Sequence, residues 1–131
     1  MPDYTVTNLK RDVEDMAPRF GMAPDLESRF ARKALGLEQQ GLSYYRFAPN
    51  FRLPIGHRHS DQEEVYLVLS GSLRVKLEDE VVELGPFDAL RVPGPVARGM
   101  EAGPDGAELI ATGAPNTENK DAEMLQNWWT D

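Results

Sequence analysis

The sequence contains no cysteine, and this absence excludes disulfide bonds, thiolate metal sites, iron–sulfur clusters and cysteine nucleophiles. It also contains no apolar run near the ~20 residues that a membrane-spanning helix needs. No basic stretch followed by an apolar stretch opens the chain, so we expect a cytoplasmic protein. Basic residues are outnumbered, 14 Lys and Arg against 22 Asp and Glu, and the formal charge of -8 disfavours binding to nucleic acid or to anionic membranes.

The length of 131 residues suits a single domain, and 40% hydrophobic residues suffice for one core. The 10 prolines and 11 glycines favour turns and short strands over a bundle of long helices. From residue 41 onward, apolar residues recur in short segments separated by turn residues. These segments predict strands over residues 42–47, 64–69, 73–77, 81–84, 89–92, 96–100 and 108–112. Short strands at this regular spacing predict an all-β sandwich or barrel.

The first 40 residues follow a different pattern. Apolar residues at helical spacing within residues 9–16 follow Asn8, a favourable N-cap, and predict a short helix that Pro18 and Gly21 end. Residues 26–37 fit a helical face and an edge strand equally well, so both assignments stay open.

The C-terminal segment, residues 119–129, predicts a closing helix. Its apolar residues Met124, Leu125, Trp128 and Trp129 would lie on one helical side. We interpret the two tryptophans as packing anchors for the tail, and a platform for a ligand is the alternative.

The strand over residues 64–69 is apolar on both faces. Tyr66 and Val68 lie on one side, and Val65, Leu67 and Leu69 lie on the other. One face packs in the core, and the other requires a terminal segment or a second copy of the chain to cover it. We therefore expect a homodimer.

The two histidines of the sequence, His57 and His59, are separated by one residue. In a strand this spacing sends both imidazoles to the same face, with Cα atoms about 6.5 Å apart, so both can reach one ion at about 2.1 Å. Arg58 then points the opposite way. A turn over residues 60–62 and a strand that begins near Glu64 return a carboxylate toward the histidines. Two imidazoles and one carboxylate are a donor set for divalent iron, manganese, nickel or zinc with open positions.

The segment over residues 56–71, GHRHSDQEEVYLVLSG, resembles the first motif of the cupin superfamily. That motif has two histidines one residue apart, a glutamate, and a glycine after six further residues. Glu64 fits the motif carboxylate because six residues separate it from Gly71, and Glu63 becomes its outward-facing neighbour. The segment over residues 85–93, GPFDALRVP, is similar to the second cupin motif.

The resemblance covers residues 42–113 and implies a double-stranded β-helix, a small jelly-roll barrel with a pocket at its mouth. Cupins include dioxygenases, sugar isomerases, decarboxylases and proteins that only bind. We expect one structural domain: an N-terminal segment over residues 1–40 that packs on the barrel, the barrel itself over residues 41–115, and a C-terminal tail or helix over residues 116–131.

Three positions depart from the cupin pattern. The glycine that introduces the first motif is replaced by Asn50 or Phe51, of which Asn50 tolerates a left-handed backbone better. The glycine that opens the second motif is replaced by Phe87. Arg98 stands where cupins usually place their last metal-binding histidine, so His57, His59 and Glu64 form a three-ligand site at most.

Arg98 has two interpretations. About 4 Å from a divalent ion its charge would oppose metal binding by of order 8 kcal/mol at an effective dielectric of 20, unless it points past the ion and binds a carboxylate or phosphate of the substrate. Alternatively, Arg98 pairs with Glu64 and the site needs no metal. Tyr66, on the face of Glu64, is a further candidate for substrate binding. Tyr44 is another candidate for substrate binding. Its side chain would line the pocket in one of the two possible orientations of the strand over residues 42–47.

Our leading hypothesis is a protein that binds a small anionic molecule and holds a divalent iron, manganese, nickel or zinc ion through His57, His59 and Glu64. It would act as a metal-dependent oxygenase or isomerase, or bind without catalysis. The alternative is a metal-free ligand-binding or sensing protein, in which Arg98 with Glu64 fixes the pocket. Between them lies a metal-free isomerase with His57 or His59 as the base.

Overall fold

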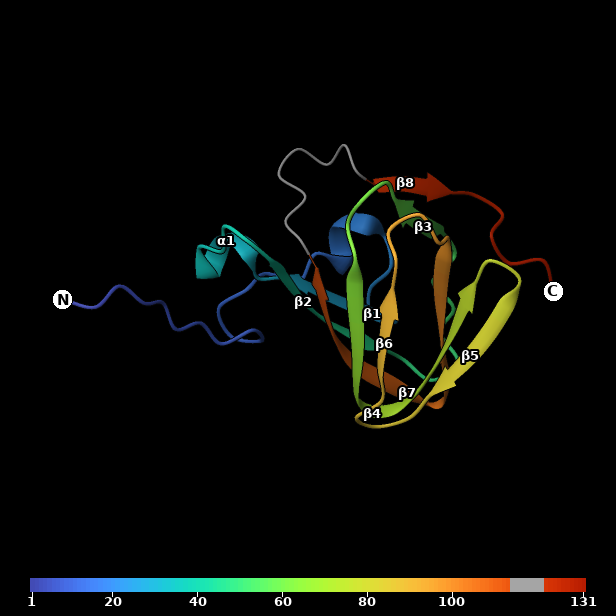
Figure 1. Cartoon of the computed structure of the whole chain (residues 1–131). Helices are drawn as coiled ribbons and strands as arrows, with labels where there is room; N and C mark the ends of the chain where they lie inside the picture. Colours follow the sequence, from blue (N-terminus) through green and yellow to red (C-terminus); the bar gives the residue numbers. More distant parts are fainter. Residues whose placement is uncertain (114–121) are drawn as a thin grey trace.

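Figure 1 shows the computed structural model, which describes residues 1–113 and 122–131. In chain order its elements are η1 (Ala17–Phe20), β1 (Leu26–Phe30), α1 (Arg32–Leu35), β2 (Gly41–Phe47), β3 (Gly56–His59), β4 (Glu64–Leu77), β5 (Glu80–Leu84), β6 (Ala89–Val92), β7 (Arg98–Gly113) and β8 (Ala122–Leu125). Every pairing between these strands is antiparallel. The all-β class predicted from the sequence is confirmed.

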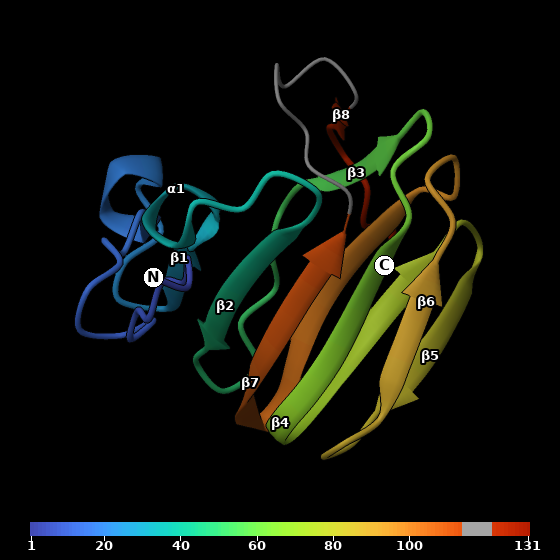
Figure 2. The same cartoon turned by 60° about the vertical axis from the view of Figure 1, so that its left-hand side comes forward.

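Two long strands, β4 and β7, pair along most of their length and belong to both layers of the curled sheet. The first half of β4 pairs with β6, and the second half of β7 pairs with β2, which pairs with β1. The second half of β4 pairs with β5, and the start of β7 pairs with β3, which pairs with β8. Figure 2 shows the two long strands side by side, with β2 next to β7 and with β5 and β6 on the side of β4.

The long strands turn from one layer to the other at two glycines. Gly71 and Gly106 have φ angles of 75° and 77°, and a Cβ on Gly71 would lie 2.0 Å from the carbonyl oxygen of Gly106. The register of β4 shifts on both sides of Gly71, which marks β-bulges. Because a bulge bends a strand without ending it, the segments predicted as separate strands over residues 64–69 and 73–77 form one strand. The same holds for 96–100 and 108–112 in β7.

Two of the residues that replace cupin glycines adopt the backbone conformation that glycine favours. Asn50 has a φ angle of 61°, which agrees with the choice of Asn50 over Phe51. Phe87 has a φ angle of 69°, and its side chain is 79% exposed. A left-handed backbone at an aromatic residue is strained, because its Cβ approaches the following carbonyl oxygen.

The N-terminal region contains less helix than expected at residues 9–16. There the Asn8 side chain accepts hydrogen bonds from two backbone N–H groups, but only a turn forms, so the predicted helix is wrong. Instead, Asp15 forms an isolated antiparallel β-bridge with Arg29 of β1, so the backbone of this segment pairs with a strand. Pro18 lies in the first turn of η1 and Gly21 ends it. Residues 26–37 contain both of the open alternatives, since β1 is followed by α1.

The predicted C-terminal helix is also wrong where the structure describes it. Residues 122–125 form β8, which pairs with all four residues of β3. The open backbone edge of β3 offers hydrogen bonds that a helix could not use, and this outweighs the helical spacing of the apolar residues. The predicted helix residues 119–121 lie outside the described residues.

The core lies between the two layers. Its largest fully buried hydrophobic side chains are Tyr66, Phe47, Leu73, Leu109, Val68, Val75 and Val92. Within the described residues, no helix is long and apolar enough to cross a membrane.

Candidate functional site

The two imidazoles project from β3 to the same side of the sheet, as strand alternation predicts. Their rings meet edge to face, with centroids 5.1 Å apart and planes at 85°. The side chains are 20% exposed for His57 and 8% exposed for His59. Arg58, between them, is exposed, and its guanidinium contacts Glu123 of β8 at 2.6 Å.

Glu64, the first residue of β4, brings a carboxylate to the imidazoles. Its Oε1 lies 3.3 Å from Nε2 of His57 and 3.3 Å from Nε2 of His59. One ligand atom from each of the three residues lies within 4.8 Å of the others. Glu63, the alternative carboxylate in the sequence, is exposed and pairs instead with Arg91 at 3.1 Å.

Two further side chains converge on the same carboxylate oxygen. Nη1 of Arg98 donates a hydrogen bond to Oε1 of Glu64 at 2.9 Å, and the Tyr66 hydroxyl donates to it at 2.8 Å. Arg98 is fully buried, and its Nη2 donates to the backbone carbonyls of Pro93 at 2.7 Å and Gly94 at 3.2 Å. This guanidinium is therefore held in place by three hydrogen bonds.

The register of the sheet explains how residues far apart in the sequence meet. Arg98 begins β7 and lies directly opposite His57 of β3. On the other side of β7, it lies opposite Leu77, the last residue of β4. Because β4 and β7 are antiparallel, Glu64 lies opposite Gly113, the last residue of β7. Only the curl of the sheet brings the first residues of these two strands together.

The electrostatics favour an ionised Glu64. Burial by itself would raise the pKa of Glu64, but hydrogen bonds from His57 and Tyr66 and the charges of the histidines hold it below its ordinary value. Burial raises the pKa of Tyr66, and the charge of Glu64 raises it further, so the phenol remains a neutral donor. The site is thus the carboxylate of Glu64 surrounded by hydrogen-bond donors.

Tyr44 lies away from this cluster. Its hydroxyl donates to Glu108 at 2.5 Å, and Lys10 Nζ lies 5.1 Å from the centroid of its ring. Its neighbour Tyr45 packs against the core, and burial and the charge of Glu64 raise the pKa of Tyr45. Sequence reasoning missed Tyr45, and the signal that could have found it is Phe47, two residues on, whose burial fixes the inward face of β2.

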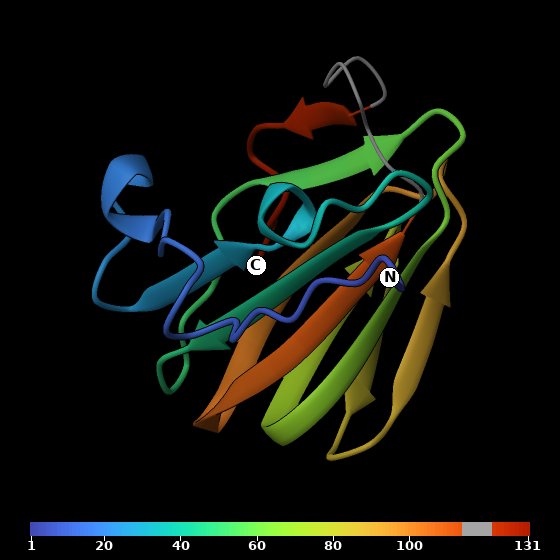
Figure 3. The same cartoon turned by 90° about the vertical axis from the view of Figure 1, so that its left-hand side faces the viewer.

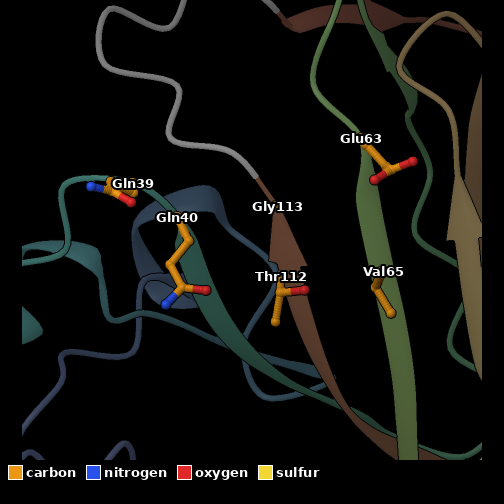
Figure 4. Close-up of a pocket in the computed structure, with 6 residues that line it drawn as sticks. All are labelled: Gln39, Gln40, Glu63, Val65, Thr112 and Gly113. Atoms are coloured by element: carbon orange, nitrogen blue, oxygen red, sulfur yellow. The ribbon is translucent and has the colours of Figure 1, made fainter.

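A separate depression lies on the outer face of the sheet. Figure 4 shows the residues that line its volume of about 300 Å³: Gln39, Gln40, Glu63, Val65, Thr112 and Gly113. Val65 and Thr112 lie opposite each other in the register of β4 and β7. Val65 follows Glu64 in the strand and therefore faces away from the carboxylate cluster. This depression is distinct from the histidine site.

The three candidate ligands fit a divalent metal in type, and their ligand atoms lie within 4.8 Å of one another. Two ligands bound at 2.0 to 2.2 Å with a tetrahedral angle between them lie roughly 3.3 to 3.6 Å apart. The 3.3 Å separations from Glu64 to each imidazole nitrogen agree with this spacing. Nη1 of Arg98 lies 2.9 Å from the same Glu64 oxygen, and its positive charge would oppose an ion there. The residues therefore fit a three-ligand site that Arg98 weakens.

Solved structures share this fold over most of the chain. A cupin protein from Bacteroides fragilis aligns with a TM-score of 0.68 and 19% identity, covering 100% of this chain and 99% of that one. The polyketide cyclase RemF from Streptomyces resistomycificus aligns with a TM-score of 0.73 and 22% identity, covering 100% of this chain and 89% of its own. A sugar phosphate isomerase from Silicibacter pomeroyi aligns with a TM-score of 0.64 and 17% identity, covering 79% of this chain and 77% of that one. These likenesses confirm the double-stranded β-helix.

Sequence comparison assigns the family. No curated protein sequence matches this chain significantly. The family model described as "Cupin domain" matches residues 43–111, which is more than half of the chain. That stretch contains the histidine strand, Glu64 and Arg98. The chain therefore belongs to the cupin domain family.

Proposed function

We propose that this cupin binds a small anionic organic molecule at a divalent metal ion held by His57, His59 and Glu64. The observation that carries this proposal is the convergence of the two imidazole nitrogens on one carboxylate oxygen, each at 3.3 Å. Iron, manganese, nickel and zinc accept such a set of two imidazoles and one carboxylate. Three protein ligands leave positions open for a substrate.

The charge of the site favours an anionic ligand. Glu64 and Arg98 cancel each other, so a divalent ion would leave the buried cluster with a net charge of about +2. A carboxylate or another ligand with two oxygen donors would offset this charge. Arg98 would attract the ligand mainly through its charge and its Nε, because both Nη groups already donate to protein oxygens. Its Nε is buried and has no hydrogen-bond partner among the described residues.

The reaction class we propose is oxygenation or isomerisation of this small anionic substrate. A bound divalent ion would supply Lewis-acid or oxygen-binding chemistry. The protein's own residues would orient the substrate: Arg98 attracts its negative group, and Tyr66 keeps the Glu64 carboxylate in place. The isomerase and the cyclase among the structural neighbours support an enzyme of this general kind.

Elemental analysis tests the metal site. The protein should be purified without a metal-affinity tag, as wild type and as His57→Ala and His59→Ala. Arg58→Ala is the matched control, because Arg58 lies on the same strand but pairs with Glu123 on the exposed face. We expect near-stoichiometric metal in the wild type and in Arg58→Ala, and loss of the metal in both histidine variants. Equal metal content in all four proteins would contradict the site.

A metal-free binding protein is the second candidate function, and the burial of Arg98 favours it. A fully buried guanidinium 2.9 Å from Glu64 already supplies the positive charge that the carboxylate needs. In that case anions such as small carboxylates should raise the unfolding temperature of chelator-treated protein. Under the metal-dependent proposal, that stabilisation should appear only after metal is restored.

We also propose that the protein is a homodimer. The described N-terminal segment leaves apolar side chains exposed, 76% for Tyr4 and 84% for Val6. On the outer face of β4, Leu69 is 37% exposed. A second copy would cover these groups. Light scattering at micromolar concentration should give the mass of two chains, and the mass of one chain would contradict the dimer.

A further inference from the structure

Trp128 lies against bare backbone close behind the candidate site. A Cβ added at Gly56 would lie 2.6 Å from Cγ of Trp128, and a Cβ added at Gly99 would lie 2.4 Å from its Cδ1. Real Cβ atoms do not approach other atoms so closely, so a side chain at either position would displace the indole. The ring therefore packs directly on the main chain of β3 and β7.

The two glycines are sequence neighbours of two site residues. Gly56 precedes His57, and Gly99 follows Arg98. The register that places His57 opposite Arg98 also places Gly56 across from Gly99. Successive residues of a strand face opposite sides of a sheet. His57 and Arg98 face the site, so Gly56 and Gly99 face the outer side, and the Trp128 indole covers that outer side.

Lys76 and the end of the chain hold the ring in this position. Lys76 lies opposite Gly99 in the register of β4 and β7, so it borders the two glycines. Its Nζ donates to the backbone carbonyl of Trp128 at 2.7 Å and lies 4.6 Å from the ring centroid. Next in sequence, Nε1 of Trp129 donates to the carbonyl of Leu53 at 2.8 Å. The indole of Trp128 thus packs between the ammonium group of Lys76 and the backbone at Gly56 and Gly99.

The strand that carries the histidines pairs mainly with the C-terminal strand β8. Among the described residues, β3 pairs with β7 at one position, His57 with Arg98, and with β8 at four positions. Figure 3 shows β8 running alongside β3. Both β8 and Trp128 belong to the C-terminal segment. The N–H of His59 also donates to the carbonyl of Gly94 at 2.8 Å. Most of the strand pairing of β3 is nevertheless with the C-terminal segment.

We propose that Trp128 is a positioning residue, which fixes the alignment of β3 with β7 and thereby sets the distance between His57 and the Glu64–Arg98 pair. This inference rests on the proposed metal site for its effect on binding. Its effect on the backbone of β3 can be measured without any metal. The ring acts by shape, since Nε1 of Trp128 has no partner among the described residues.

The test combines two measurements on the full-length protein: amide hydrogen exchange of residues 57–59 in the metal-free state, and titration with Co²⁺ followed by its visible absorption. The variants are Trp128→Ala, Trp128→Phe and Gly99→Ala, with the double variant Trp128→Ala/Gly99→Ala. Phe20→Ala is the control, because Phe20 is an aromatic residue that is 49% exposed and lies in η1, on a different segment from Trp128. Gly99→Ala keeps Trp128 but adds a methyl group where the indole packs, so it tests the same contact independently.

We expect Trp128→Ala and Gly99→Ala each to speed exchange in β3 at least tenfold relative to the centre of β4. Each should also weaken Co²⁺ binding at least tenfold and change its absorption spectrum. Trp128→Phe should stay within threefold of wild type, and the double variant should be no weaker than Trp128→Ala. Unchanged exchange in β3, or equal acceleration throughout the sheet, would overturn the inference. If the wild type binds no Co²⁺, the proposed metal site fails, and the exchange data still decide the role of Trp128.

Discussion

Replacing Arg98 with glutamine is expected to strengthen the binding of a divalent ion at His57, His59 and Glu64. Arg98 carries a full positive charge, is completely buried, and contacts the carboxylate oxygen that faces both imidazoles. Glutamine removes the charge and keeps an amide that can donate to the carbonyls of Pro93 or Gly94. The substitution therefore removes a repulsion while leaving a polar side chain in the cavity.

The size of the repulsion follows from the contact between Arg98 and Glu64. Nη1 lies 2.9 Å from Oε1, and a metal–oxygen bond is about 2.1 Å long, so an ion on Oε1 lies at most about 5 Å from Nη1. At that distance, charges of +2 and +1 repel by about 7 kcal/mol at an effective dielectric of 20. Relaxation of the site reduces this value, and even one fifth of it corresponds to about a tenfold change in affinity.

Calorimetric titration with Mn²⁺ or Co²⁺ measures the effect, with thermal unfolding as a check that the variant folds. Arg91→Gln is the control, because Arg91 pairs with Glu63 at the surface, where its charge is screened. We expect at least tenfold tighter binding in Arg98→Gln and no change in Arg91→Gln. Weaker binding in a folded Arg98→Gln would refute the reasoning and show that the guanidinium supports the ion's site.

Three other substitutions test local features of the structure. Phe87→Gly should raise the free energy of unfolding by about 1 kcal/mol in urea titrations, because glycine relieves the positive φ angle; a loss of stability would contradict the strain. Partial burial of Glu27 opposes its ionisation, but hydrogen bonds from Arg29 and Arg46 lower its pKa. Its ionised form therefore stabilises the fold above the unfolded pKa of about 4.3, and this stabilisation is lost as the pH falls through the folded value. Glu27→Gln should therefore lose less stability than wild type between about pH 5 and pH 3, and parallel acid-unfolding curves would argue against it. Tyr66→Phe removes one donor from the Glu64 carboxylate and should cost about 1 to 3 kcal/mol of stability, which an unchanged urea midpoint would disprove.

The histidine strand shows how much of the site the sequence could predict. Alternation along a strand was enough to place both imidazoles on one face and Arg58 on the other. The count of six residues before Gly71 selected Glu64 over Glu63, and the structure places Glu64 beside the imidazoles. These predictions worked because they depend on the local geometry of one extended segment.

The contacts that depend on tertiary structure could not be predicted in the same way. The orientation of β2 decides whether Tyr44 or Tyr45 faces the interior, and each side of that strand carries both a tyrosine and a polar residue, Ser43 on one side and Arg46 on the other. The C-terminal segment has helical spacing, but the open edge of β3 draws it into a strand. In both cases the deciding factor is a neighbouring strand that is distant in the sequence.

The strand boundaries failed for a related reason. Ser70 and Gly71 are typical turn residues, and alone they predict the end of a strand. In the structure the chain continues through a bulge, because the carbonyl of Gly106 on the paired strand leaves room for nothing larger than glycine. Turn residues at the corner of a barrel and in a hairpin have the same composition, and only the partner strand distinguishes them.

The most direct test of the metal site is anomalous diffraction from crystals of the protein supplied with Mn²⁺ or Zn²⁺, recorded on both sides of the metal's absorption edge. The proposal predicts one anomalous peak within about 2.2 Å of Nε2 of His57, Nε2 of His59 and a carboxylate oxygen of Glu64. A map without a peak there, with Arg98 still hydrogen-bonded to Glu64, would contradict the metal site and favour the metal-free binding protein.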